Sequence, residues 1–148
     1  MQYPDYLYKI LPSSATPPSP LPEVLELSAL DARDGFIHLS TSYQILHTLN
    51  CFFSAEPFVF LLRVPYSRVA KYITWEDTEG KTLGDINCNT ASEQSTRFFP
   101  HLYPSSDDNV TNKSLKLGCD EVDRFAKWEN HGFPWDAEGW PFVEDIPT

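Results

Sequence analysis

His38, Glu76 and His101 are the residues of this sequence best suited to acid–base chemistry. Imidazole exchanges a proton near neutral pH, and a glutamate beside Trp75 is expected to be partly removed from water, which raises its pKa toward a useful range. A histidine taken alone is more often a structural residue that bonds to a backbone carbonyl. The prediction that these three residues are catalytic therefore depends on the elements that position them.

The segment 36–40 is predicted as a strand, because its side chains alternate with a period of two. Ile37 and Leu39 then lie on one face, and His38 shares the other face with Phe36 and the hydroxyl of Ser40. Directly behind it, residues 41–44 match a capping box and are followed by apolar residues at helical spacing. This arrangement predicts a strand and a helix joined at the first histidine.

Residues 72–76 alternate in the same way, so that Trp75 points inward and Glu76 closes the strand on the opposite face. The long segment 77–97 is rich in Gly, Asn, Ser, Thr and acidic residues, which predicts a loop that is either functional or unstructured. Residues 98–104 form an aromatic patch bracketed by prolines. We interpret this patch as a rigid loop that carries His101 and lines a pocket.

The rest of the chain supplies the elements of a single α+β domain spanning residues 1–148. The other predicted elements are a strand at 6–11, a Pro-rich surface segment at 12–22, a short helix or turn near 23–30, a central strand at 58–64, a strand within 109–117, a helix at 120–130 and a tail at 133–141 whose large rings pack against the body.

The composition excludes several classes of protein. With 148 residues and 41% hydrophobic content, the chain suits one core, and its net charge of −10 repels phosphate backbones and anionic lipid surfaces. We therefore expect no nucleic-acid partner and no membrane partner. No apolar run is long enough to span a membrane and no leader is visible, so we expect a cytoplasmic location. The three cysteines are widely spaced, which predicts reduced thiols and no metal site.

Three blocks of sequence, 34–41, 75–76 and 99–103, resemble the family catalogued as domain of unknown function 952 in their residues and in their order. The resemblance runs from about Tyr6 to about Val110. The stretch 119–148 has no counterpart in it and is interpreted as a divergent C-terminal extension. The resemblance implies a curved, split antiparallel or mixed sheet with a few helices, similar to the ADP-ribosyltransferase superfamily, whose central cleft holds a nicotinamide nucleotide.

On this pattern, His38 would bond a ribose hydroxyl, Glu76 would polarise the ribose or stabilise an oxocarbenium-like transition state, and His101 would form a wall against a base or acceptor. The residues predicted or implied to contact the substrate are Ser40, Thr41, Arg63, Trp75, Phe99 and Tyr103. For Arg63, the alternative is a carboxylate partner within the protein, because a buried charge needs one wherever it lies.

Three functions stay open, all with a small-molecule ligand. The first is a transferase or glycohydrolase that acts on NAD or a related ribosyl compound. The second is an isomerase, lyase or cyclase that uses the histidines and Glu76 as acid and base without a cofactor. The third is a non-catalytic ligand-binding module. Neither the substrate nor the oligomeric state follows from the sequence, and a pocket shared by His38, Glu76 and His101 would favour the enzymes.

Overall fold

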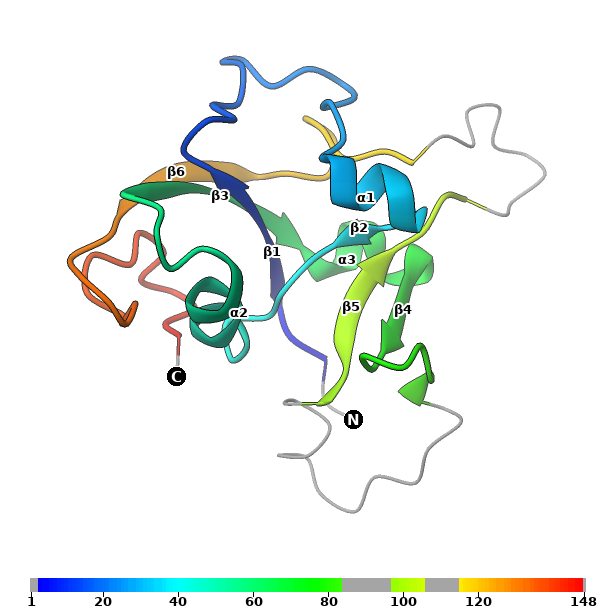
Figure 1. Cartoon of the computed structure of the whole chain (residues 1–148). Coiled ribbons are helices and arrows are strands. Elements are labelled where there is room, and N and C mark those ends of the chain that lie inside the picture. The colour runs from blue at the N-terminus through cyan, green and yellow to red at the C-terminus, as the bar shows by residue number, and fades with distance from the viewer. Residues whose placement is uncertain (1–2, 84–96, 106–114, 148) are drawn as a thin grey trace.

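A computed structural model of the chain describes residues 3–83, 97–105 and 115–147. Within these residues the strands form two three-stranded antiparallel sheets, which lie next to each other in Figure 1. Short helices join and cover the sheets. The chain is thus a small α+β domain, as its sequence predicts.

The first sheet consists of β1 (Tyr6–Pro12), β3 (Phe58–Pro65) and β6 (Arg124–Glu129), in the order β1-β3-β6. The nearly continuous apolar sequence of β3 fits its central place, because both of its faces are covered. The strand predicted at 6–11 and the central strand predicted at 58–64 are both confirmed.

The strand β6 corrects the sequence analysis, which predicted a helix over residues 120–130. Residues 124–129 pair with β3 along their whole length. Trp128 is buried whereas Phe125 and Lys127 are exposed, so the side chains follow a period of two. The strand forms because β3 supplies its backbone with hydrogen-bond partners, a long-range contact that overrides weak local propensity.

The second sheet contains β2 (Ile37–His38), β5 (Phe99–Leu102) and β4 (Ile73–Glu76), in the order β2-β5-β4. Strands were predicted at 36–40 and 72–76, and both exist in shorter form.

The segment 98–104 was predicted as a rigid loop, and this prediction was wrong, because residues 99–102 form the central strand of the second sheet. Pro100 removes one donor from the ladder but keeps its acceptor. Its carbonyl oxygen accepts a hydrogen bond from the Leu39 N–H at 3.1 Å. A proline in the sequence of a central strand therefore costs one backbone hydrogen bond and leaves the rest of the pairing intact.

A hydrophobic core fills the space between the two sheets. Leu7 and Leu62 reach it from the first sheet, and Ile37, Trp75 and Leu102 reach it from the second. The second sheet thus turns one face to the core, and its other face carries the side chains that alternate with these residues.

A second hydrophobic cluster covers the opposite face of the first sheet. The helix α2 (Ile45–Phe52) contributes Ile45 and Leu49, and the C-terminal tail, which lies beside this helix in Figure 1, contributes most of the large rings. The buried rings of β6 and the tail are Trp128, Trp135, Trp140 and Phe142. The prediction that the tail packs against the body is confirmed.

The helix α2 begins directly after the predicted capping box, but only half of that box forms. The Gln44 side-chain oxygen accepts a hydrogen bond from the Thr41 N–H at 3.1 Å, whereas the Thr41 hydroxyl has no partner in the described part of the chain. Phe52 is one of the apolar residues at helical spacing behind the capping box, yet it is 79% exposed. The helix ends at that residue, so its last apolar side chain passes beyond the core.

Three short helical segments complete the fold. The helix α1 (Ala29–Asp34) begins near the end of the segment 23–30, where a helix or turn was predicted. The helix α3 (Tyr66–Val69) and the 3-10 helix η1 (Ala70–Tyr72) connect β3 to β4.

Several predictions concern residues outside the described part. The loop predicted at 77–97 and the strand predicted within 109–117 lie mostly there, and Cys88 lies there entirely. Cys51 and Cys119 are described, and both are free thiols. Among the described helices, none has the length and apolar character needed to cross a bilayer.

Candidate functional site

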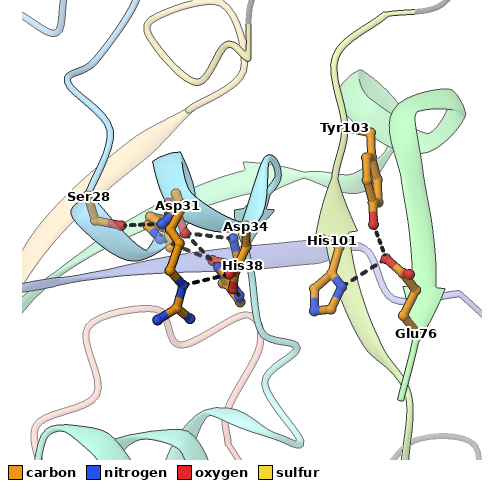
Figure 2. Close-up of polar contacts among 9 residues, drawn as sticks. Ser28, Asp31, Asp34, His38, Glu76, His101 and Tyr103 are labelled. Carbon is orange, nitrogen blue, oxygen red and sulfur yellow. Dashed lines mark hydrogen bonds and ion pairs between the residues drawn. The ribbon is translucent and has the colours of Figure 1, made fainter. Parts of the chain in front are cut away.

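The second sheet brings the three predicted catalytic residues to the same face. In this sheet β5 lies between β2 and β4, so that His101 is paired with His38 on one side and with Thr74 on the other. The two imidazole rings lie 5.3 Å apart between centroids. His101 Nδ1 lies 3.0 Å from Glu76 Oε1 (Figure 2). This face is the one opposite the hydrophobic core.

His101 is held in one orientation by two contacts. Its ring stacks on Phe36, with centroids 4.1 Å apart and planes inclined by 19°, and its Nδ1 bonds to Glu76. Because a carboxylate oxygen only accepts hydrogen bonds, Nδ1 carries the hydrogen and Nε2 keeps its lone pair. In the described part of the chain, Nε2 has no hydrogen-bond partner.

The protonation state of His101 suits a base at neutral pH. Burial lowers the pKa of His101 below its ordinary value of 6.5, and this effect outweighs the opposing attraction of the Glu76 carboxylate. The side chains of both residues are only 13% exposed. The imidazole is therefore neutral at pH 7, with Nδ1 anchored and the lone pair of Nε2 not bound by any described residue.

Tyr103 adds a second donor to the same carboxylate oxygen. Its hydroxyl donates to Glu76 Oε1 at 2.5 Å, and Figure 2 shows that the two donors approach this oxygen from different sides. Burial, together with the hydrogen bond to Glu76, raises the pKa of Tyr103 to about 12. The phenol therefore stays protonated and helps to fix the Glu76 side chain.

His38 is placed differently, because both of its ring nitrogens face carboxylates. Nδ1 lies 2.7 Å from Asp31 Oδ1 and Nε2 lies 3.1 Å from Asp34 Oδ2. Gly35, with a φ of 79°, ends α1 in the left-handed conformation. This turn carries the chain back along its own helix, so that His38 meets two carboxylates that precede it by four and seven residues.

Asp31 is a site residue that the sequence analysis missed. Its Oδ1 also accepts from the His38 N–H at 3.2 Å, and its Oδ2 binds Lys9 Nζ at 2.6 Å. Burial by itself would raise the pKa of Asp31, but the hydrogen bond from His38 and the charge of Lys9 outweigh it and hold the pKa below its ordinary value. The only local signal was a carboxylate one helical turn before Asp34.

Arg63, a predicted substrate contact, does not reach this face. Its guanidinium donates to both Asp123 carboxylate oxygens, at 2.9 and 2.8 Å, and its side chain is only 5% exposed. It lies in β3 of the first sheet. The alternative interpretation of Arg63, a carboxylate partner within the protein, is therefore confirmed.

The other predicted substrate contacts divide between the core and the site face. Trp75 is buried in the core between the sheets. Ser40 is buried, with its hydroxyl 3.3 Å from that of Thr48, and Thr41 is buried at the start of α2. Phe99 stands opposite Glu76 in the sheet and, by the alternation along β5, shares the face of His101.

Two cavities adjoin this region, and neither is lined by His38, Glu76 or His101. One, of about 220 Å³, includes Asp31 in its wall. The other, of about 320 Å³, includes Asp77, Arg97 and Phe99. The three residues thus gather on one sheet face, while these two cavities lie beside it. Among the described residues, no group of three or more His, Cys, Asp or Glu side chains is arranged to hold a metal ion.

The lowered pKa of His101 predicts a pH dependence of stability. As the pH falls through 6.5, the unfolded chain takes up a proton at His101 before the folded chain does, so the free energy of unfolding should decrease until the lower, folded-state pKa is passed. Above pH 6.5 this contribution is fully present. Urea denaturation between pH 5 and pH 8 would measure the slope.

The variant His101→Gln should lose this part of the slope, and His131→Gln, which changes an exposed imidazole, should retain it. Equal slopes in the wild type and His101→Gln would contradict the assignment.

Comparisons with known proteins assign the chain to a family. The model of the family described as "Protein of unknown function (DUF952)" matches residues 20–113. The chain is similar to protein CC0527 from Caulobacter crescentus, with 26% sequence identity. Its X-ray structure superposes with a TM-score of 0.56, and the alignment covers 97% of this chain and 93% of that one. The solution NMR structure of CC0527 gives 25% sequence identity and a TM-score of 0.51, and the alignment covers 97% of this chain and 92% of that one. No curated protein matches the sequence.

Proposed function

The chain belongs to the DUF952 family, and because the description of that family names no reaction, we propose a function from the geometry of the site. The protein is an acid–base enzyme in which His101 exchanges a proton with a small substrate bound at the outer face of the sheet β2-β5-β4. The observation that carries this proposal is the neutral His101 imidazole, whose Nδ1 is anchored by Glu76 and whose Nε2 keeps a lone pair that no described residue binds.

The chemistry follows from this arrangement. Nε2 accepts a proton from a C–H or O–H bond of the substrate, and the electron pair of that bond stays on the substrate. The resulting imidazolium returns the proton to another atom of the same molecule, which completes an isomerisation, or to a leaving group, which completes an elimination. Glu76 orients the imidazole and stabilises its charge, as the third member of a nucleophile–base–carboxylate set does.

The charges around the site support an uncharged or cationic substrate. The carboxylates of Glu76 and Asp34 lie on either side of the two imidazoles. The nearby cation Lys9 is already bound to Asp31 at 2.6 Å. The net charge of −10 acts in the same direction, because it repels anions from the whole surface.

The same observations make the nucleotide reaction the weaker candidate. In the ADP-ribosyltransferase-like interpretation, His38 bonds a ribose hydroxyl, but both of its ring nitrogens already face carboxylates. A pyrophosphate also needs cationic partners. Millimolar NAD should therefore leave the melting temperature unchanged, whereas micromolar binding would raise it by several degrees.

The acid–base proposal is tested by screening a metabolite library for conversion in D2O by proton NMR. The wild type should convert or deuterate at least one neutral or cationic compound, and His101→Gln should lower that rate by roughly 10²–10⁴-fold. The variant Glu76→Gln should show a smaller loss, because it keeps the base and removes only the charge that orients it.

His131→Gln serves as the matched control and should react at the wild-type rate, with circular dichroism confirming that each variant is folded. Unchanged turnover in His101→Gln would refute the proposal. Compounds that bind without reacting, with an affinity that His101→Gln leaves intact, would identify a binding module in place of an enzyme.

A further inference from the structure

The cavity of about 220 Å³ is not lined by His38, Glu76 or His101 and has its own chemical character. Most of its wall is apolar. The apolar residues come from the strands β1, β2 and β3, from the segment 13–28 and from the segment that contains Leu117. They include Leu11, Leu25, Leu27, Ile37, Leu62 and Leu117. The polar residues of the wall include the ion pair of Lys9 and Asp31, together with Thr16, Glu26 and Ser28.

The Lys9 ammonium has a hydrogen-bond donor to spare. Its three N–H groups meet two acceptors in the described chain, Asp31 Oδ2 at 2.6 Å and the His38 carbonyl oxygen at 3.3 Å. Lys9 is only 8% exposed, so solvent satisfies little of the remainder. A buried ammonium at the wall of an apolar cavity gains from a third acceptor that enters it.

The charges of the wall select the ligand. Asp31 neutralises Lys9, and Glu26 adds a further carboxylate, so an anion in the cavity would meet a net negative charge. A cation would approach an ammonium and offers it no acceptor. A neutral carbonyl oxygen satisfies Lys9 without either penalty.

We propose that this cavity binds a small neutral molecule with an apolar body and one carbonyl group, whose oxygen accepts a hydrogen bond from Lys9. An apolar cavity of roughly 150 Å³ holds benzene, and the larger volume here admits a substituted ring or a short branched chain. The segment 13–28 forms the outer wall and includes exposed residues such as Ala15, Thr16 and Pro18, so the cavity lies close to the surface of the domain.

The cavity site is independent of the proposed reaction at His101, but it is linked to His38. Asp31 binds Lys9 through Oδ2 and His38 through Oδ1, so one carboxylate faces both regions. A ligand on Lys9 should therefore shift the NMR signals of the His38 ring, even though it does not touch that ring.

Two probes of nearly the same size and shape test the proposal, namely acetophenone and α-methylstyrene, in which a methylene group replaces the carbonyl oxygen. Titration of the full chain, followed by NMR, should show acetophenone binding roughly fivefold or more tightly. Benzoate, which adds a negative charge, should bind more weakly than acetophenone.

Leu25→Trp fills the cavity and keeps the ion pair, and it should abolish the binding of acetophenone. Its matched control is Leu30→Trp, a change at a leucine that is 45% exposed and does not line the cavity. The variant His101→Gln should bind acetophenone as the wild type does, which separates this test from that of the proposed reaction. Equal affinities for the two probes, no binding at millimolar concentration, or binding that survives Leu25→Trp would each overturn the proposal.

Discussion

Asp31→Ala is expected to lower the free energy of unfolding by about 3–5 kcal/mol, the range found when one partner of a buried ion pair is removed. The Asp31 side chain is 2% exposed and that of Lys9 is 11% exposed, so the ammonium left behind is largely shielded from water. The substitution also removes the acceptor for the His38 N–H and the partner of its Nδ1. Urea denaturation at pH 7 would measure the change.

Asp34→Ala is the matched control for this prediction. Asp34 also contacts His38, but its other partner, Arg33, has a side chain that is 72% exposed, and the Asp34 side chain itself is 27% exposed. Solvent can replace these contacts, so the change in stability should be much smaller than for Asp31→Ala. Similar losses in the two variants would mean that the buried pair with Lys9 is not what stabilises this region.

Trp128→Ala should be comparably destabilising, at about 3–5 kcal/mol, because it opens a large cavity where β6 meets the tail. Trp128 is 1% exposed and packs against Trp135 and Trp140, with ring centroids 5.0 and 5.1 Å away. Its indole N–H also donates to the Glu138 carbonyl oxygen at 2.8 Å. Denaturation followed by circular dichroism would measure the loss without relying on tryptophan fluorescence.

Phe52→Ala provides the comparison for a large ring that is not buried. Phe52 is 79% exposed at the end of α2, and its removal should change the free energy of unfolding by no more than about 0.5 kcal/mol. If Trp128→Ala were as mild as Phe52→Ala, the tail would be dispensable for stability. In that case the cluster around Trp128 would not be a second core of the domain.

Among the candidate residues, the structure favours His101 over His38 as the base. Both were predicted as catalytic because each lies among apolar and aromatic residues. In the fold, His38 faces carboxylates with both nitrogens, whereas among the described residues only Nδ1 of His101 has a partner. The difference arises from which segments are neighbours in space, so the flanking sequence of each histidine did not reveal it.

The features that depend on local periodicity could be predicted from the order of the amino acids alone. The alternation in 72–76 correctly separated Trp75, in the core, from Glu76, on the opposite face. The continuous apolar run at 58–64 correctly predicted a central strand. The order of three short blocks was enough to predict the family. The first two signals are carried by residues that are adjacent or two apart in the chain, and the third by short blocks whose order can be read without the fold.

The pairings between distant segments could not be predicted in this way and are visible in the folded chain. Residues 124–129 became a strand because β3 satisfies their backbone, and residues 99–102 became one because β2 and β4 lie on either side. Lys9 and Asp31, which are 22 positions apart in the chain, form an ion pair. Such contacts are selected by the free energy of burying and pairing whole elements, which no local pattern of side chains encodes.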